Sequence, residues 1–178
     1  MRELDAFSIT DHDTIAAYPV PKDLRDRVIN GLEVDSQFEG DTVHLLAYGI
    51  GNNYSPLMCA LRTQREARYL RMAAMVGRLN ALGIPIQLDE VLARAGGGSI
   101  GRPHLARALV AKGYVSDTQE AFNRYIADDG DGYVALARLS TAEIIDLIHR
   151  SGGVAVVAHP KRLPSSVHLS DVCDLGAD

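Results

Sequence analysis

Cysteines and long apolar runs are scarce in this chain, and each shortage excludes a class of protein. The two cysteines, Cys59 and Cys173, lie far apart in the sequence and form no Cys-x-x-Cys pair. We therefore expect reduced thiols, and neither a disulfide framework nor a cysteine-ligated zinc site. No run approaches the roughly 18 apolar residues that span a bilayer, and the charged start Met1–Asp5 is not a signal peptide. The sequence predicts a cytoplasmic protein with no membrane partner.

Positive charge is also in short supply. Lysine and arginine total 18 against 23 aspartates and glutamates, which gives a net charge of −5 in 178 residues. This balance argues against an extended nucleic-acid-binding surface. A nucleotide substrate is still compatible with it, because bound divalent cations reverse the sign of charge at a site. The apolar content of 47% is typical of a globular protein with a real core.

Strand-like and helical patterns divide the chain into an α/β layer and a helical insertion. Apolar, β-branched runs predict strands at Leu4–Thr10, Val28–Phe38, Thr42–Ile50 and Gly153–Ala158, with a hairpin at Glu39–Asp41. Helical patterns cover Pro56–Leu82, Leu88–Ala95, Pro103–Lys112, Thr118–Ala127 and Thr141–Arg150. We therefore predict an α/β domain over residues 1–54 and 139–178, interrupted by an all-helical insertion over residues 55–138.

Metal-capable side chains lie within or just after four of the apolar segments. They are His12 in Ile9–Thr14, Glu33 in Gly31–Asp35, His44 in Val43–Leu46 and His159 in Val156–Pro160. A polar side chain in a buried strand is costly unless a partner satisfies it, and a shared metal would do so. A lone histidine of this kind is more often an ordinary core or functional residue, so the joint pattern carries the prediction. Because barrel-type α/β enzymes build their sites at strand ends, we expect the four side chains to meet at the C-terminal ends of strands.

A glycine-rich loop, Gly96–Gly101, runs into a predicted helix that begins with Arg102, Pro103 and His104. The first turn of a helix offers free backbone N–H groups and a positive dipole end, which suit a phosphate. Arg102 adds a two-pronged donor and His104 a further one. An ordinary capped helix with a solvated arginine is the alternative interpretation of this loop.

An acidic cluster over Asp128–Asp131 invites comparison with a calcium-binding loop. Neither register supplies glycine at position 6 and glutamate at position 12 of an EF-hand loop. We therefore expect a solvated turn there.

These segments together resemble the PHP (polymerase and histidinol phosphatase) family, in particular its branch of small bacterial phosphoesterases. That branch includes 3′,5′-nucleoside bisphosphate phosphatases and 5′–3′ exoribonucleases. The resemblance spans almost the whole chain, and the matching stretches are Ile9–Thr14, Gly31–Val34, Val43–Gly49, Gly101–Leu109, Gly113–Val115, Ala121–Tyr125, Tyr133-Val134 and Ser151–Pro160.

The resemblance implies an α/β fold, a partial and distorted (β/α)7 barrel similar to a TIM barrel, with a metal cluster. The implied metal ligands are His12, Glu33, His44 and His159. The implied substrate-binding residues are Asp13, Gly101, Arg102, Pro103 and His104. Manganese is the expected ion, with iron or zinc as alternatives.

The implied activity is that of a metal-dependent phosphoric ester hydrolase. It would remove phosphate from a 3′,5′-nucleoside bisphosphate, or act at the 5′ end of a short RNA, through a metal-activated water. A phosphatase on another small phosphate, such as histidinol phosphate, is an alternative. A catalytically impaired member of the family is a second alternative, from a different functional class.

The sequence departs from the family pattern at two places. The family pattern begins with a His-x-His pair and ends with an Asp-x-His pair, and this sequence contains neither. We therefore expect an incomplete barrel and weak catalysis by this chain alone. Unpaired strand edges would also favour self-association.

Overall fold

A computed structural model describes residues 4–51 and 55–178, and its contacts divide the chain into two compact units. Unit 1 comprises Met1–Thr63 and Arg138–Asp178, and unit 2 comprises Gln64–Ala137. The contact boundary lies inside a long helix, whereas the predicted insertion starts at residue 55. A helical insertion that forms a separate subdomain over residues 55–138 stays a prediction.

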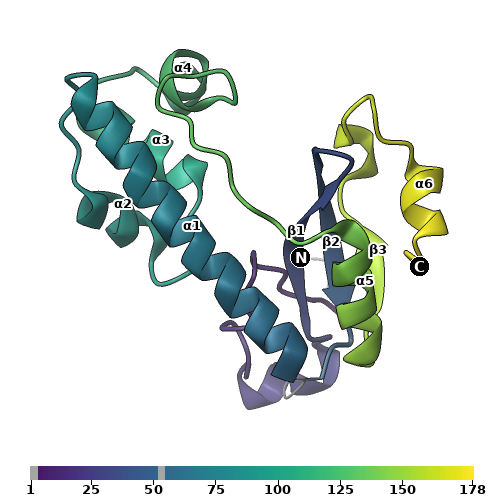
Figure 1. Cartoon of the computed structure of the whole chain (residues 1–178). Coiled ribbons are helices and arrows are strands. Elements are labelled where there is room, and N and C mark those ends of the chain that lie inside the picture. Colours follow the sequence, from purple (N-terminus) through teal and green to yellow (C-terminus); the bar gives the residue numbers. More distant parts are fainter. Residues whose placement is uncertain (1–3, 52–54) are drawn as a thin grey trace. The chain divides into compact units, whose positions relative to one another are not determined.

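Unit 1 contains a three-stranded antiparallel sheet in the order β1-β2-β3 (Figure 1). The strands are β1 (Gly31–Phe38), β2 (Asp41–Tyr48) and β3 (Val154–Val157). The turn between β1 and β2 has positive φ angles of 49° at Glu39 and 95° at Gly40. Glycine adopts such angles without steric cost, and the predicted hairpin is confirmed.

One face of this sheet forms the core of unit 1. Alternate residues of β1 and β2 point to the same face, and these apolar positions are fully buried. Helix α5 (Thr141–Arg150) packs against this sheet, and its isoleucines complete the core (Figure 1). Each fully buried leucine or isoleucine contributes roughly 1.5–3 kcal/mol. The core side chains are Leu32, Val34, Val43, Leu45, Ala47, Ile144, Ile145 and Ile148.

The predicted first strand, Leu4–Thr10, is not a regular strand. The stretch from Phe7 to His12 runs parallel to residues 28–33, with isolated bridges between Phe7 and Val28 and between His12 and Glu33. The hydroxyl of Tyr18 lies between the two segments. It accepts hydrogen bonds from the backbone N–H groups of Ile9 (2.9 Å) and Gly31 (3.3 Å). A side chain therefore takes backbone partners that a continuous strand ladder would have paired.

Unit 2 is helical and has its own core. Its helices are the greater part of α1 (Ser55–Ala81), then α2 (Leu88–Ala95), α3 (Arg102–Ala111) and α4 (Thr118–Ala121). The chain continues after α4 as a π-helical turn over Phe122–Ile126, so the helix predicted at Thr118–Ala127 is regular only at its start. The other predicted helices are confirmed to within a residue or two. The fully buried core side chains include Met75, Leu79, Leu105, Leu109 and Ile126.

The fold is a mixed α/β fold. The short elements are η1 (Lys22–Arg27), η3 (Pro160–Arg162) and α6 (Leu169–Asp174). The part of the chain that the structure describes contains one small antiparallel sheet, so the predicted ring of β/α units is not confirmed. Within those same residues, no helix is long and apolar enough to cross a membrane.

Candidate metal centre

The second face of the β1–β2 hairpin presents two carboxylates and an imidazole. Glu33 and Asp35 are two residues apart in β1 and therefore point to the same face. The strand register places Asp35 directly opposite His44 of β2. The intervening residues of both strands point into the core, so burial on one face fixes which side chains line the other.

Two further histidines reach this face from distant parts of the chain. His12 is held beside β1 by backbone hydrogen bonds from Asp13 N to Glu33 O (2.8 Å) and from Glu33 N to Asp11 O (3.1 Å). His159 follows β3, and its preceding residue donates a backbone hydrogen bond to His44 O. The backbone of His159 has φ of 33°, in the left-handed region. Such a conformation is costly for a non-glycine residue and is often found at functional sites.

Glu33, His44 and His159 form the first group of possible metal donors. Oε1 of Glu33 lies 2.8 Å from Nδ1 of His44 and 3.2 Å from Nε2 of His159. The two ring nitrogens are 3.3 Å apart. One atom from each residue can be chosen so that all lie within 4.8 Å of one another, a spacing suited to one ion.

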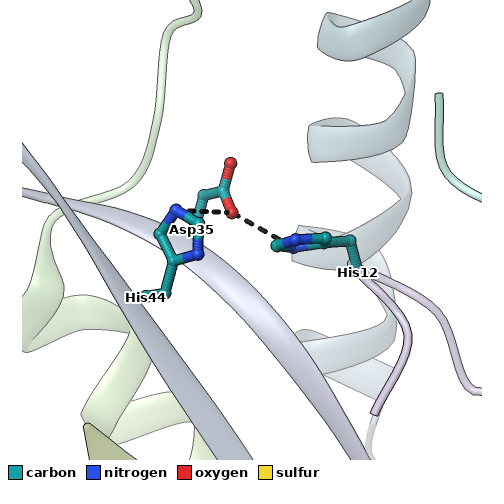
Figure 2. A group of neighbouring side chains, drawn as sticks. All are labelled: His12, Asp35 and His44. Carbon is teal, nitrogen blue, oxygen red and sulfur yellow. Dashed lines mark ion pairs between the residues drawn. The ribbon is translucent and has the colours of Figure 1, made fainter. Parts of the chain in front are cut away.

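His12, Asp35 and His44 form the second group, shown in Figure 2. Oδ1 of Asp35 lies 3.2 Å from Nδ1 of His12 and 3.5 Å from Nε2 of His44. The two imidazole rings are nearly perpendicular, with centroids 5.4 Å apart. His44 therefore belongs to both groups, with a different nitrogen facing each.

Glu33 is ionised more readily than an ordinary glutamate. Burial of the carboxylate opposes its ionisation and by itself would raise the pKa. The hydrogen bond with His44, the charges of His12 and His44 and the hydrogen bond with His159 together outweigh burial and lower the pKa. Near neutral pH this carboxylate is therefore an anion, the form that binds metal.

The chemistry of these donors fits a divalent transition metal. Imidazole nitrogen and carboxylate oxygen without thiolate suit manganese, iron or zinc. The side chains of His12 and His159 are 38% and 42% exposed, whereas that of Asp35 is 6% exposed. The donor face is therefore open to solvent on the histidine side, where a substrate could approach.

The structure brings the four predicted ligands together, and their proximity is confirmed. The prediction that all four lie at C-terminal strand ends is wrong for Glu33 and His44, which lie within β1 and β2. Their strands are antiparallel, so their C-terminal ends point in opposite directions, and the two side chains meet along the hairpin instead. Metal binding by these four residues stays a prediction.

The sequence alone did not identify Asp35 as a candidate functional residue. It is one of the few buried carboxylates, and its Oδ2 lies 3.8 Å from Nε of Arg138. In the sequence, Asp35 follows Glu33 by two residues within a predicted strand, which indicates that both side chains point to the same face. The register that sets it opposite His44 requires the hairpin geometry.

Asp13 was predicted to bind substrate, and the structure buries it completely. Its side chain has no exposed surface and its φ is 55°. Aspartate tolerates this left-handed conformation better than most residues. A role for Asp13 in substrate binding stays a prediction.

The predicted phosphate-binding segment, Gly101–His104, lies in unit 2. The guanidinium of Arg102 donates a hydrogen bond to the Ile126 carbonyl (3.2 Å), forms an ion pair with Asp128 and lies near the Tyr133 ring. The acidic turn is therefore not simply exposed to solvent, because the carboxylate of Asp128 forms an ion pair with Arg102. Phosphate binding by the segment stays a prediction.

His104 closes the first turn of α3. Its Nδ1 accepts a hydrogen bond from Gly101 N at 3.1 Å. Burial lowers the pKa of His104, the backbone of Gly101 opposes that shift, and the charge of Arg107 adds to it. The imidazole is therefore neutral near pH 7, and one of its nitrogens is engaged within the helix.

Several known proteins resemble this chain over most of its length. A 5′–3′ exoribonuclease of Escherichia coli is 36% identical over 162 residues, which cover 87% of this chain and 55% of that protein. A 3′,5′-nucleoside bisphosphate phosphatase of Chromobacterium violaceum is 32% identical over 160 residues, with 87% and 56% covered. A solved structure from Bifidobacterium adolescentis, called a metal-dependent phosphoesterase, matches with a TM-score of 0.86 at 32% identity. That match covers 98% of this chain and 65% of the other.

The matches cover most of this chain but only part of each similar protein. The chain spans about half the length of the curated relatives that it matches. No protein-family model matches the sequence. The relatives nevertheless agree on one kind of chemistry, since all three names describe hydrolysis of phosphate esters.

Proposed function

This chain belongs to the PHP family of phosphoesterases, and from that premise we propose that it uses divalent metal ions to hydrolyse phosphate esters of nucleotides. The observation that carries the proposal is the cluster of Glu33, His44 and His159, whose donor atoms lie 2.8–3.3 Å apart. Residues so distant in the sequence, and so costly to place together, are best explained by a shared ligand.

The proposed metal ligands are His12, Glu33, His44 and His159. Bound ions would stabilise charge on the phosphoryl oxygens and activate water. Glu33 supplies negative charge at the centre of the cluster, because its pKa is lowered. The imidazoles of His12 and His159 would supply nitrogen donors on the exposed side, where a substrate would enter. Manganese is the first choice of ion, and iron or zinc would suit the same donors.

The proposed substrate is a nucleotide phosphate. Relatives of this chain are named for action on 3′,5′-nucleoside bisphosphates and on RNA from its 5′ end. Both substrates present a phosphate monoester or diester on a ribose. In this proposal Arg102, Gly101, Pro103 and His104 contact phosphate, and Asp13 contributes to substrate binding. A guanidinium matches two phosphate oxygens at once, which favours Arg102 as the principal contact.

The finer fold is also a proposal. We infer that the unit 1 sheet is part of a distorted β/α barrel of the family type. Two parallel bridges, Phe7 with Val28 and His12 with Glu33, support this inference, because the strands of such barrels pair in parallel. A cytoplasmic location belongs to the same proposal.

The test is product release by the full chain, with and without manganese: inorganic phosphate from the bisphosphate and mononucleotide from the RNA. Adenosine 3′,5′-bisphosphate and a short 5′-phosphorylated RNA serve as substrates, so that the two candidate substrates are distinguished. We expect manganese to stimulate release, and EDTA or Glu33→Gln to abolish it. Glu39→Gln is the matched control, since Glu39 is an exposed glutamate in the adjoining hairpin turn. Equal product release with and without metal would overturn the proposal, as would no release of phosphate or mononucleotide from either substrate.

A further inference from the structure

We infer that Tyr133 is a positioning residue for Arg102: its ring holds the guanidinium in place beside the start of α3. In this inference Tyr133 does not itself contact a phosphate. It restricts the motion of Arg102 before an anion arrives. Both residues belong to unit 2. The inference rests on the proposed contact between Arg102 and phosphate, and its first test requires neither phosphate nor metal.

Arg102 lies over two aromatic rings. Its Cζ is 5.5 Å from the centroid of the Tyr133 ring and 5.6 Å from that of the Phe122 ring. A cation within about 6 Å of the centroid, over the face of the ring, is attracted by the negative charge of that face. Such a contact uses no N–H donor of the guanidinium. The rings can therefore hold Arg102 while its donors bind an anion.

The backbone around Tyr133 is fixed by a tight turn. Tyr133 N donates a hydrogen bond to Gly130 O at 2.9 Å, and the carbonyl of Tyr133 accepts one from the guanidinium of Arg78. A Cβ atom at Gly132 would lie only 2.8 Å from Tyr125 O, so this approach requires glycine. The turn therefore places the ring of Tyr133 at a defined position.

A second arginine, Arg71 of α1, fixes the ring of Tyr133 itself. Its Cζ lies 5.2 Å from the centroid of the ring, and its Nε donates a hydrogen bond to Val134 O at 2.5 Å. Arg71 is only 8% exposed, whereas the side chain of Arg102 is 26% exposed. Arg102 is therefore the arginine of this pair that an anion reaches more easily from solvent.

Holding Arg102 in advance should strengthen anion binding. A free arginine side chain has many rotamers, and fixing one of them costs conformational entropy. A guanidinium that is already held loses less entropy on binding, so its affinity is higher. The exposed carboxylate of Asp128 can give way to a phosphate, while the ring of Tyr133 stays in contact with Arg102.

Direct contact between the Tyr133 hydroxyl and the anion is the competing assignment. Tyr133→Phe separates the two, because it keeps the ring and removes the hydroxyl. Positioning through the ring predicts unchanged phosphate affinity in this variant, whereas direct contact predicts a loss. The contacts of Tyr133 with Arg71 and Arg102 are both made through the ring, which favours positioning.

The first experiment measures the motion of Arg102 by 15N relaxation of its Nε in the chain without metal or phosphate. We expect a higher order parameter for Arg102 than for Arg107, an exposed arginine of the same helix. Tyr133→Leu should lower the value for Arg102 toward that of Arg107, and Tyr133→Phe should preserve it. Equal order for the two arginines in the unmodified chain would overturn the inference, even where a variant fails to fold.

The second experiment titrates inorganic phosphate into the full chain in EDTA and follows the backbone amide of His104 by NMR. Tyr133→Leu should weaken binding about 2–30-fold, the range that corresponds to loss of a cation–π contact. Tyr133→Phe should bind as the unmodified chain does. Tyr114→Leu is the matched control, because Tyr114 is a half-buried tyrosine of unit 2 whose hydroxyl donates to Pro85 O at 3.2 Å. Equal losses in the Tyr133→Leu and Tyr114→Leu variants would overturn the inference.

The third experiment repeats the Tyr133→Leu titration in an Arg102→Ala chain. A residue that acts only through Arg102 should then cause no further loss of phosphate affinity. The same fold-loss in both backgrounds would overturn the positioning role, because Tyr133 would act on the anion without Arg102. If the unmodified chain bound no phosphate, the proposed phosphate contact would fail, whereas the relaxation measurement would still decide whether Tyr133 holds Arg102.

Discussion

In unit 2, Asp128 forms an ion pair with Arg102 and would compete with a phosphate for the guanidinium of Arg102. Its present partners are the Asp128 carboxylate and the Ile126 carbonyl. The side chain of Asp128 is 76% exposed. Exposed ion pairs of this kind contribute about 0–1 kcal/mol. A hydrogen bond to a charged group contributes about 1.5–3 kcal/mol, so a phosphate should displace Asp128.

The prediction at the residue scale is that Arg102→Ala weakens binding of inorganic phosphate by about 1.5–3 kcal/mol. Asp128→Asn should act in the opposite direction and strengthen binding by up to about 1 kcal/mol, because it removes the competing anion. Calorimetry on the full chain measures both. Arg107→Ala, an exposed arginine of the same helix, is the control. Identical affinities for the Arg102 and Arg107 variants would refute the prediction.

The sequence was enough to predict the histidines and Glu33 of the candidate site, but not Asp35. Histidine and glutamate inside apolar segments stand out by composition alone. Asp35 becomes significant only through its register with His44 and the approach of Arg138, and register is a tertiary property. Tyr18 similarly interrupts a predicted strand through hydrogen bonds to residues 9 and 13 positions away along the chain.

At the scale of elements, local signals located the helices well. Helix α5 begins and ends where the sequence predicts, because Ser140 and Glu143 form a capping box at its start. Alternation of apolar residues likewise located β1 and β2. The expectation that Glu33 and His44 lie at strand ends came from the way barrel enzymes build their sites, and the structure instead pairs the two strands within the predicted hairpin.

The cap of α5 gives the first prediction at this scale. The Ser140 side chain accepts a hydrogen bond from Glu143 N, and the Glu143 carboxylate accepts one from Ser140 N at 2.9 Å. Ser140→Ala should lower the free energy of unfolding by about 0.5–2 kcal/mol, the usual cost of losing such a cap. Urea denaturation measures the change. Ser165→Ala, at an exposed turn, is the control, and equal stability of the two variants would contradict the prediction.

The start of α4 gives a pH-dependent prediction. Hydrogen bonds from the backbone and hydroxyl of Ser116 and from Arg124 lower the pKa of Glu120 from 4.5 to about 2. Because the folded-state pKa is the lower one, this contribution to stability is complete above pH 4.5. It is lost as the pH falls toward about 2.

Thermal unfolding between these pH values tests the Glu120 contribution. Glu120→Gln should make the decline of the melting temperature with falling pH shallower than in the unmodified chain. Ser116→Ala keeps the backbone hydrogen bond and removes only the hydroxyl, so its curve should lie between the two. Parallel curves for the unmodified chain and Glu120→Gln would rule out the assigned cause.

At the scale of the whole molecule, each compact unit has its own buried core. Leu45 is fully buried in unit 1 and Leu105 is fully buried in unit 2. Replacing either with alanine should cost about 2–5 kcal/mol through lost burial and the cavity left behind. Hydrogen exchange should then show the largest loss of protection within the unit that carries the substitution. Loss of protection spread evenly over the chain in both variants would contradict this expectation.

The β1–β2 hairpin has a consequence for the order in which the molecule assembles. Glu33, Asp35 and His44 all belong to one hairpin, whose strands close across a two-residue turn. Hairpins of this kind form in about 1–10 μs. His159 is 115 residues beyond His44, so its approach requires a long loop to close and comes later. We therefore expect Glu33, Asp35 and His44 to come together before His159 reaches them. A divalent ion captured at that stage would act as a template for refolding, and it would speed the docking of β3 rather than merely occupy a finished site.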